Sequence, residues 1–363
     1  MGSWIGDALR IQLFGESHGK VVGIVMDGLE AGLELDEEQI RQDLRKRRPK
    51  KEVSQARREE DEYQILSGYY QGHTTGTPLT VIFPNLDIDD RPYEEWKDFY
   101  RPSHSDYVSM KKYHGWSDLR GGGHFSGRLT TPLVFAGSLA KSILKKKGIQ
   151  IGTRIFQIGA IQDDILEEYP VSMIQRWEED DFPVENKKTK EKYLEYVREI
   201  KEQKDSIGGI LESVILAKPY FIGAPFFDSI EAKLSSYLFA IPSLKGIEFG
   251  DGFSFASKKG SEVNDLWIKK GDDIVTKTNH NGGINGGISN GMPIVFKTVI
   301  KPTSSIGISQ ETWNFKEEKM GELKLNGRHD ACIALRVPVI QSSLIALAIL
   351  DLAVMEYGKS WML

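Results

Sequence analysis

The chain of 363 residues has one cysteine, seven histidines and little net charge. Cys332 has no second cysteine to pair with, so an intramolecular disulfide is excluded and the composition fits a reducing cytoplasm. The net charge of −5, from 47 basic and 52 acidic side chains, disfavours broad nucleic-acid binding, which requires a basic protein or a large basic face. An anionic ligand would therefore need a local basic patch.

Long apolar runs and metal-ligand spacings are also missing. The longest apolar run near the C-terminus, residues 344–350, stops at Asp351 and predicts a core helix, because it is too short to span a membrane. The first residues, MGSWIGDALR, have no apolar signal-peptide region, and Gly6 stands where a myristoylation signal needs Ser or Thr. The histidines form no i, i+4 pair. We therefore expect a cytoplasmic protein without a metal site.

The two commonest nucleotide signatures are absent as well. The segment Gly122-x-x-x-x-Gly127-Arg128-Leu129 comes close to a P-loop but lacks the Lys-Ser/Thr pair that holds phosphate and magnesium. No G-x-G-x-x-G follows a convincing strand. Neither a P-loop nucleotidase nor a Rossmann dehydrogenase is predicted.

Glycine and positively charged residues are concentrated in residues 101–128. Residues 101–128 read RPSHSDYVSMKKYHGWSDLRGGGHFSGR and hold three of the seven histidines, with Arg120 and Arg128 flanking the triplet Gly121-Gly122-Gly123. A glycine-rich turn before a helix exposes N–H groups that favour an anion. The same pattern is also typical of a plain tight connection. The segment is thus a candidate site for a phosphorylated ligand, with histidines available for proton transfer.

Hydrophobic periodicity and turn residues predict a mixed fold. Strands are expected within residues 8–30, 63–83, 151–161 and 208–218. Helices are expected from Asp36 to before Pro49, over 129–148, around 193–200 on the surface, from Asp228 to before Pro242, and over 338–356. Seven of the residues 41–51 are Arg or Lys, which favours a solvated helix end or an arm for a polyanion. The absence of regular βαβ alternation predicts an α+β class.

Several motifs follow one another along the chain. They are Gly15-Glu16-Ser17-His18-Gly19, Arg47-Arg48-Pro49, Arg57-Arg58-Glu59, Thr74-Thr75-Gly76-Thr77-Pro78, Arg101-Pro102-Ser103-His104, Arg120-Gly121-Gly122-Gly123 with Ser126-Gly127-Arg128, Asp205-Ser206-Ile207-Gly208-Gly209, Gly250-Asp251-Gly252-Phe253, the glycines of 282–287, Lys301 to Ser305, and Gly327-Arg328-His329-Asp330. Taken together and in this order, they resemble the chorismate synthase family over about residues 5–355.

The resemblance implies a lyase of the shikimate pathway of aromatic amino-acid biosynthesis. The reaction would be trans-1,4-elimination of phosphate from 5-enolpyruvylshikimate 3-phosphate to give chorismate, with reduced FMN that is not consumed. It also implies a homotetramer and a β-α-β sandwich, with a helical layer between two antiparallel sheets. Residues 1–363 are expected to form one domain.

The resemblance assigns roles to individual residues. His104 is the acid for the leaving phosphate, His18 controls protonation of the reduced flavin, and Asp330 assists proton removal near the flavin. The remaining residues divide into flavin contacts and substrate contacts. Flavin contacts are Ser126, Arg128, Gly286, Lys301, Pro302, Thr303, Ser304, Ser305 and Arg328. Substrate contacts are Arg47, Arg48 and Arg120, and in bifunctional members the Arg47–Arg48 turn also meets NADPH.

The chain departs from the usual family pattern at several of these motifs. His124-Phe125-Ser126-Gly127-Arg128 replaces the common R-S-S-A-R, which puts a flavin contact at His124 in doubt. Lys50 replaces a glycine, Glu52-Val53 stands where an arginine is common, Ala331 replaces a proline, and Ser105 follows His104. We expect activity with altered substrate or flavin affinity.

Three other functions remain as alternatives. The first is an NAD(P)H-dependent flavin reductase or another flavoenzyme, which the missing dinucleotide fingerprint disfavours. The second is a nucleic-acid-binding protein that uses residues 41–51, which the net charge disfavours. A metal enzyme is the third and is disfavoured by the histidine spacing, so His73, His114 and His280 are interpreted as loop or packing residues.

Overall fold

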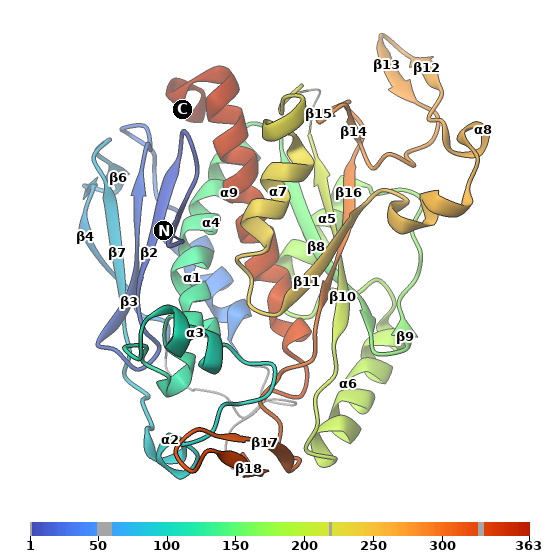
Figure 1. Ribbon diagram of the computed structural model, residues 1–363. Coiled ribbons are helices and arrows are strands. Elements are labelled where there is room, and N and C mark those ends of the chain that lie inside the picture. Colours follow the sequence, from blue (N-terminus) through green and yellow to red (C-terminus); the bar gives the residue numbers. More distant parts are fainter. Residues whose placement is uncertain (1, 49–59, 218–219, 326–329) are drawn as a thin grey trace.

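The computed structural model describes residues 2–48, 60–217, 220–325 and 330–363, and it consists of two antiparallel sheets with helices between them. Figure 1 shows one sheet at the left, the other at the right, and the central helices between them. These helices are α1 (Glu37–Arg47), α4 (Thr130–Lys146), α7 (Ile230–Leu238) and α9 (Val337–Tyr357). The expected α+β sandwich is confirmed.

The first sheet is built from the N-terminal quarter of the chain. Its order is β1 (Trp4–Ile5), β2 (Arg10–Gly15), β3 (Val21–Asp27), β7 (Leu79–Pro84) and β4 (Gln64–Ser67). Strand β7 alternates buried and half-buried residues, so Leu79, Val81 and Phe83 face the helices. The strands expected within 8–30 and 63–83 are therefore confirmed.

The second sheet has the order β11 (Leu244–Phe249), β16 (Ile294–Ile300), β10 (Gly209–Leu216), β8 (Gln150–Ile158) and β9 (Ile161–Gln162). Its central strand β10 pairs with both neighbours, with Val214 opposite Val295 on one side and Gly152 on the other. A chain of hydrogen bonds links this sheet to α9: Gln341 accepts from Thr298 at 2.7 Å and donates to Ser213 at 2.8 Å. All three side chains are buried, so the link fixes how α9 sits on the sheet.

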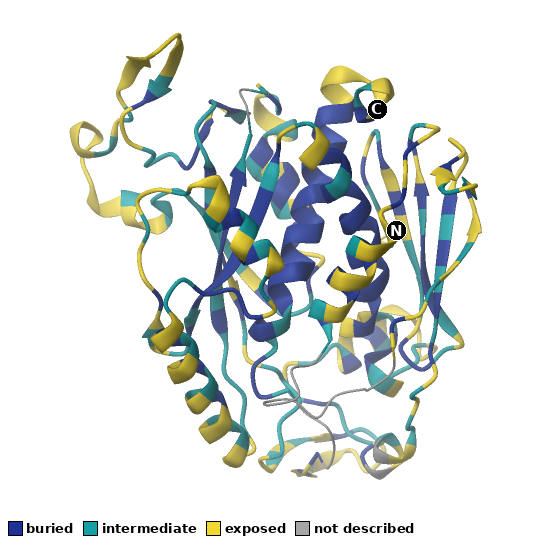
Figure 2. Cartoon of the chain, turned by 180° about the vertical axis from the view of Figure 1, so that it is seen from behind, coloured by how far each residue is buried: buried dark blue, intermediate teal, exposed yellow. Residues whose placement is uncertain are grey.

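The central helices carry a large share of the core, and Figure 2 shows them as the buried layer. Helix α9 is long and apolar enough to span a membrane, but its apolar window is fully buried inside the protein, as predicted for a core helix. Asp351 does not end this helix. Its buried carboxylate accepts backbone N–H groups of Ala8 and Leu9 at 2.9 and 2.8 Å and thereby ties the N-terminal segment to α9.

The remaining elements lie around this sandwich. The peripheral helices are α2 (Arg91–Glu95), α3 (Asp106–Lys112), α5 (Val171–Glu179), α6 (Lys187–Glu202) and α8 (Gly260–Val263), with 3-10 turns η1 (Arg120–Phe125), η2 (Gly127–Leu129), η3 (Phe226–Asp228), η4 (Gly252–Ser257), η5 (Ile333–Arg336) and η6 (Lys359–Met362). The two-stranded pieces are β5 (Tyr69–Tyr70) with β6 (His73–Thr74), β12 (Trp267–Lys270) with β13 (Asp273–Thr276), β14 (Ile284–Asn285) with β15 (Ile288–Ser289), and β17 (Gln310–Asn314) with β18 (Lys319–Leu323).

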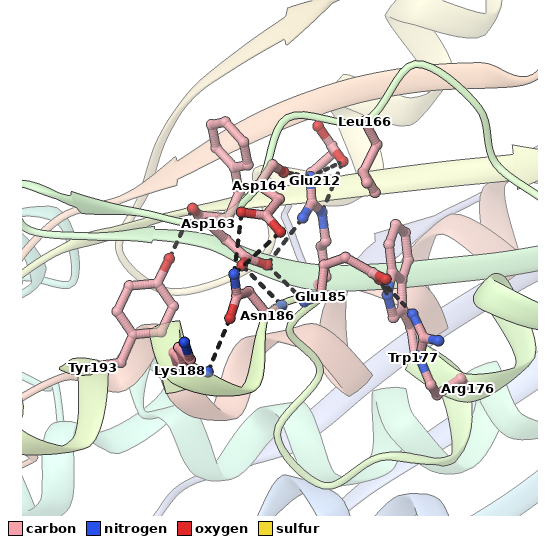
Figure 3. Close-up of polar contacts among 12 residues, drawn as sticks. Asp163, Asp164, Leu166, Arg176, Trp177, Glu185, Asn186, Lys188, Tyr193 and Glu212 are labelled. Atoms are coloured by element: carbon pink, nitrogen blue, oxygen red, sulfur yellow. Dashed lines mark hydrogen bonds and ion pairs between the residues drawn. The ribbon is translucent and has the colours of Figure 1, made fainter. Parts of the chain in front are cut away.

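A buried ion cluster anchors the segment between β9 and α6 to the second sheet (Figure 3). Arg154 on β8 is fully buried and donates to Glu212 at 2.9 Å and to Asp163 at 3.0 Å. Asp163 also accepts the backbone N–H groups of Glu185 and Asn186 at 2.7 and 3.1 Å. Each charge is paired and hydrogen-bonded, so this cluster is structural.

Two local expectations need correction. The helix expected to begin at Asp228 is capped by Ser229, whose hydroxyl accepts the N–H of Ala232, because residues 226–228 form the separate turn η3. The basic run of residues 41–51 is not only a solvated face: Arg47 is buried, because the end of α1 turns its guanidinium toward Asp61. Lys50, Lys51 and the Arg57-Arg58 pair lie outside the described residues.

Candidate active site

A cavity of about 490 Å³ opens where α1 ends and α9 begins, within the usual size range of a small-molecule site. Segments far apart in the sequence line it, and they meet at the end of the sandwich where α2, α3 and β17–β18 lie (Figure 1). It brings together these predicted site residues: Arg47, Arg48, His104, Ser126, Arg128, Lys301, Thr303, Ser304, Ser305 and Asp330.

The wall of the cavity is strongly basic. Among the described residues, its charged lining residues, histidine aside, are the five cations Arg47, Arg48, Arg128, Lys301 and Arg336 and the two carboxylates Asp61 and Asp330, which leaves a surplus of three positive charges. The whole chain carries −5, so the positive charge is local. Such a concave basic surface attracts a polyanionic small molecule.

One buried carboxylate holds two of these arginines. Asp61 accepts from Arg47 at 2.7 Å and also from Arg128, and all three side chains are buried. Burial alone would raise the pKa of Asp61, but the charges of Arg47 and Arg128 outweigh it and hold the pKa below its ordinary value. Asp61 therefore stays ionised and fixes both guanidinium groups at the cavity wall.

Three buried polar atoms of the wall residues have no hydrogen-bond partner among the described residues. They are Nε of Arg47, Nε of Arg48 and Oγ1 of Thr303. An unsatisfied buried polar group costs about 1–3 kcal/mol, so such atoms point to a ligand. Lys301 lies nearby and donates to the carbonyl of Ser103 at 3.2 Å. Burial, and then the charge of Lys245, lower the pKa of Lys301, which makes a bound anion favourable there.

His104 lines the cavity and is supported from behind. Its Nδ1 lies 2.6 Å from Oδ1 of Asp106, a carboxylate that Arg101 clamps with two hydrogen bonds of 2.8 Å. Burial would raise the pKa of Asp106, but the hydrogen bonds from Arg101 and His104 hold it far below its ordinary value. His104 thus presents its other nitrogen, Nε2, toward Gly122 of the cavity wall.

His18 is buried directly behind the glycine triplet. Its Nδ1 lies 2.5 Å from Oδ1 of Asp90, and its ring makes an edge contact with Tyr93 at 5.2 Å. A Cβ on Gly121 would lie 2.4 Å from Nε2 of His18, and Gly121 has a φ of 59°. The triplet therefore lets the backbone approach His18 closely, and only glycine fits at Gly121.

Asp330 lies three residues before η5 and pairs with Arg336, the last residue of that turn, at 2.7 Å. Arg336 also donates to the carbonyl of Arg47 at 3.0 Å and so connects α1 with the segment before α9. Asp330 thereby places a negative charge in the cavity wall, where most of the other charged residues are cations.

Not every predicted residue lies at this cavity. Arg120 is half-exposed and pairs with Asp118 at 2.8 Å and Asp90 at 3.0 Å, outside the cavity lining. Gly286 lies in the β14–β15 turn, next to the first residue of α7, at the opposite end of that helix from the cavity. Pro302 lies between two lining residues without lining the cavity itself. Arg328 lies outside the described residues. Their assigned ligand contacts stay predictions.

His124 has turned away from the cavity. Its Nδ1 donates to the carbonyl of Gly15 at 2.8 Å, and its Nε2 lies 3.3 Å from the hydroxyl of Ser3. The side chain of His124 therefore supports the loop that carries His18. Because both ring nitrogens are engaged there, a flavin contact need not be made from His124.

The sequence interpretation did not include several residues at or behind the wall: Ser17, Asp61, Asp90, Asp106, Pro242, Ser243 and Arg336. Ser17 and Asp106 lie inside quoted motifs and could have been chosen for their polarity. Pro242 and Ser243 follow α7 without any chemical pattern, and only the fold brings them to the cavity.

Comparison with known proteins agrees with the motifs over nearly the whole chain. The family model described as chorismate synthase matches residues 9–354. The chain is 44% identical over 337 residues to the chorismate synthase of Pyrococcus abyssi, covering 93% of both chains. It is 41% identical over 351 residues to that of Chitinophaga pinensis, covering 97% of this chain and 96% of the other. A crystal structure of chorismate synthase is 26% identical and superposes with a TM-score of 0.75, covering 98% of this chain and 94% of that one.

Proposed function

The chain belongs to the chorismate synthase family of lyases in aromatic amino-acid biosynthesis, and from that premise we propose that the cavity converts 5-enolpyruvylshikimate 3-phosphate into chorismate and phosphate with the help of reduced FMN. In this 1,4-elimination a ring C–H bond loses its proton and its electrons form a new double bond, while the existing ring double bond shifts by one position to the carbon that carries the phosphate. The C–O bond to phosphate breaks, and its electron pair leaves with the phosphate.

The observation that carries the proposal is the surplus of three positive charges around a histidine in one cavity. The substrate has two carboxylates and a phosphate, so a basic concave wall suits it. Arg48 is the cation that contributes most to substrate binding in this proposal, because it forms no ion pair with any described residue and its Nε is buried without a partner among them. Arg47 is already aligned by Asp61.

The residues also fit a flavin phosphate and ring. Three consecutive hydroxyl side chains, Thr303, Ser304 and Ser305, line the cavity beside Ser126, and Oγ1 of Thr303 has no hydrogen-bond partner among the described residues. These residues, together with Lys301 and Arg128, would hold FMN. When bound, reduced FMN supplies a reductant that is regenerated in each cycle.

His104 is proposed as the general acid for the departing phosphate. It lines the cavity, its Nδ1 faces a carboxylate, and its Nε2 is directed at the wall where the ligand binds. A phosphate dianion nearby favours the charged imidazole, which then donates the proton from Nε2. General acid catalysis of this kind contributes about 10²–10⁴-fold.

His18 and Asp330 are proposed to control protons on the flavin side. His18 lies behind Gly121, which lines the cavity, so its influence is exerted across the backbone of the triplet. Asp330 lines the cavity directly and is held by Arg336. We also propose that the protein is a single-domain, cytoplasmic homotetramer, as the family resemblance implies.

Chorismate formation under anaerobic conditions tests this proposal. The purified protein with chemically reduced FMN and 5-enolpyruvylshikimate 3-phosphate should release chorismate and phosphate in equal amounts. Oxidised FMN without a reductant should give none, and oxidised FMN with NADPH should give little. No chorismate with reduced FMN would overturn the proposal. Rapid NADPH oxidation with oxidised FMN and no chorismate would instead identify a flavin reductase.

A further inference from the structure

The geometry points to Asp106 and Asp90 as positioning residues that each hold a proton on Nδ1 of one histidine, His104 and His18, so that the two Nε2 atoms face the glycine triplet at the cavity. This inference rests on the proposed function for its catalytic meaning. The arrangement itself is a property of the protein without ligands and can be tested separately.

The first unit is Arg101–Asp106–His104. Asp106 accepts from Nε and NH2 of Arg101, both at 2.8 Å, and from the backbone N–H of Arg101 at 3.1 Å. Its Oδ1 lies 2.6 Å from Nδ1 of His104. Arg101 is itself held over the ring of Trp96 at 4.7 Å. The side chains of Arg101 and Asp106 are 6% and 1% exposed, so water cannot replace either of them.

The second unit is Arg120–Asp90–His18 and repeats the same order of groups. Oδ2 of Asp90 accepts from Arg120 at 3.0 Å, and its Oδ1 lies 2.5 Å from Nδ1 of His18. Arg120 is in turn held by Asp118 at 2.8 Å. The side chains of Asp90 and Arg120 are 42% and 48% exposed, whereas that of His18 is 5% exposed. Arg120 thereby acts on His18 through Asp90.

The distances decide which nitrogen carries the proton. A carboxylate only accepts hydrogen bonds, so the contacts of 2.6 and 2.5 Å each require a hydrogen on Nδ1. NH2 of Arg101 also lies 3.0 Å from Nδ1 of His104, but it already donates to Asp106 at 2.8 Å. In the neutral ring Nε2 is then an acceptor, and in the charged ring it is the donor that the proposed acid step needs.

The charged and polar groups around each histidine differ in their exposure. His104 faces Asp106, Arg101 and the hydroxyl of Ser105, with Lys301 beyond the carbonyl of Ser103. His18 faces Asp90, with Arg120 and Asp118 behind it, and Tyr93 against its ring. Because salt screens exposed charges and hardly affects buried ones, added salt should weaken the hold on His18 more than that on His104.

Nitrogen NMR of the protein labelled with ¹⁵N-histidine, without flavin or substrate, tests the arrangement directly. Single His104→Gln and His18→Gln variants assign the signals. At pH 7.5 the neutral rings of both residues should carry the proton on Nδ1. Asp106→Asn should move the proton of His104 to Nε2, and Asp90→Asn should do so for His18. The matched control is Asp89→Asn, because Asp89 neighbours Asp90 but pairs with Arg91 at 2.8 Å.

Single-turnover chorismate formation supplies the second readout. Asp106→Asn should lower the rate at saturating ligands by about 10²–10⁴-fold, the range of a general acid, with little change in FMN affinity. Asp106→Glu should recover part of the rate, and Asp89→Asn should behave as wild type.

The wild-type spectrum needs no variant to fold and is therefore decisive. Nε2-protonated neutral rings in wild type, or unchanged tautomers in both Asp→Asn variants, would overturn the inference. If wild type shows both Nδ1 protons but forms no chorismate with reduced FMN, the positioning stands and only the proposed function fails.

Discussion

At the scale of single residues, the cavity holds arginines that are already in ion pairs and one, Arg48, that forms no ion pair with any described residue. Arg47 and Arg128 share Asp61, and Arg336 is paired with Asp330, so their charges are partly neutralised in the free protein. Nε of Arg48 is buried without a partner among the described residues. An incoming anion therefore gains most from Arg48, because no existing ion pair has to be broken.

Arg48→Ala should weaken substrate binding by about 1.5–3 kcal/mol, which is roughly 10–100-fold, because a charge-assisted hydrogen bond is lost. FMN binding should change less. The measurement is separate titration of substrate and of FMN by calorimetry. Arg45→Ala is the matched control, because Arg45 lies on the same helix end with its side chain 57% exposed and pairs with Glu38.

Equal losses of substrate and FMN affinity in Arg48→Ala would contradict this assignment. So would a substrate affinity as high as that of the Arg45→Ala control. A changed circular dichroism spectrum would show that Arg48 supports the fold and not the ligand.

At the scale of elements, two central helices approach each other closely at a glycine. A Cβ on Gly137 of α4 would come within 2.2 Å of Cβ of Ser343 on α9. Backbones packed this closely leave no room for a methyl group. Because the N-terminal ends of α4 and α9 both border the cavity, this contact also fixes the distance between the loops that carry Arg128 and Asp330.

Gly137→Ala should destabilise the protein by about 1–3 kcal/mol, the usual penalty of overpacking, even though alanine favours helix by about 1 kcal/mol. Urea unfolding followed by circular dichroism measures it. Gly260→Ala is the control, because a Cβ there meets nothing within 4 Å. A midpoint for Gly137→Ala equal to or above that of Gly260→Ala would show that the helices can separate without penalty.

At the scale of the whole molecule, buried carboxylates join the layers and make the fold sensitive to acid. Asp43 on α1 accepts from Ser138 at 2.6 Å and Lys141 at 2.8 Å on α4, while Asp61 joins the end of α1 to Arg128. Burial would raise the pKa of Asp43, but Lys141 and Ser138 outweigh it, so the pKa lies below its ordinary value. The pKa values of Asp61 and Asp106 are also held down.

A carboxyl whose folded pKa is depressed stabilises the protein above its unfolded pKa of about 3.9, and this contribution is lost as pH falls toward the folded pKa. The urea midpoint should therefore be nearly constant above about pH 5.5 and fall steadily below about pH 5. Asp43→Asn should lower the urea midpoint at pH 7 and make that midpoint fall less steeply at acid pH. Glu317→Gln is the control, because its side chain is 54% exposed.

If the urea midpoint of Asp43→Asn falls at acid pH as steeply as that of the wild-type protein, this carboxylate is not among the groups that couple folding to pH. A midpoint that rises between pH 5 and pH 4 in the wild-type protein would contradict the sign of the whole effect.

Local pattern predicted much of this protein, because the relevant physics acts over a few residues. Asp36 caps α1 by accepting the N–H of Gln39 at 3.0 Å, as its spacing to Gln39 predicted. The apolar stripes over 129–148 and 338–356 became α4 and α9, and the strands expected within 63–83 include most of β7. The ordered motifs predicted the family and the sandwich, and both are confirmed by the comparisons.

Only the tertiary structure determined which charged side chains form ion pairs and which remain available to a ligand, because the pairing residues are distant in sequence. Asp61 lies between Arg47 and Arg128, Asp90 lies behind His18, and Pro242 and Ser243 reach the cavity only because α7 ends there. Arg120 fits a substrate contact by its motif, but in the fold Asp118 and Asp90 engage it. Sequence order thus determined the elements and the kind of chemistry, and the long-range packing of those elements determined which side chains are free to perform it.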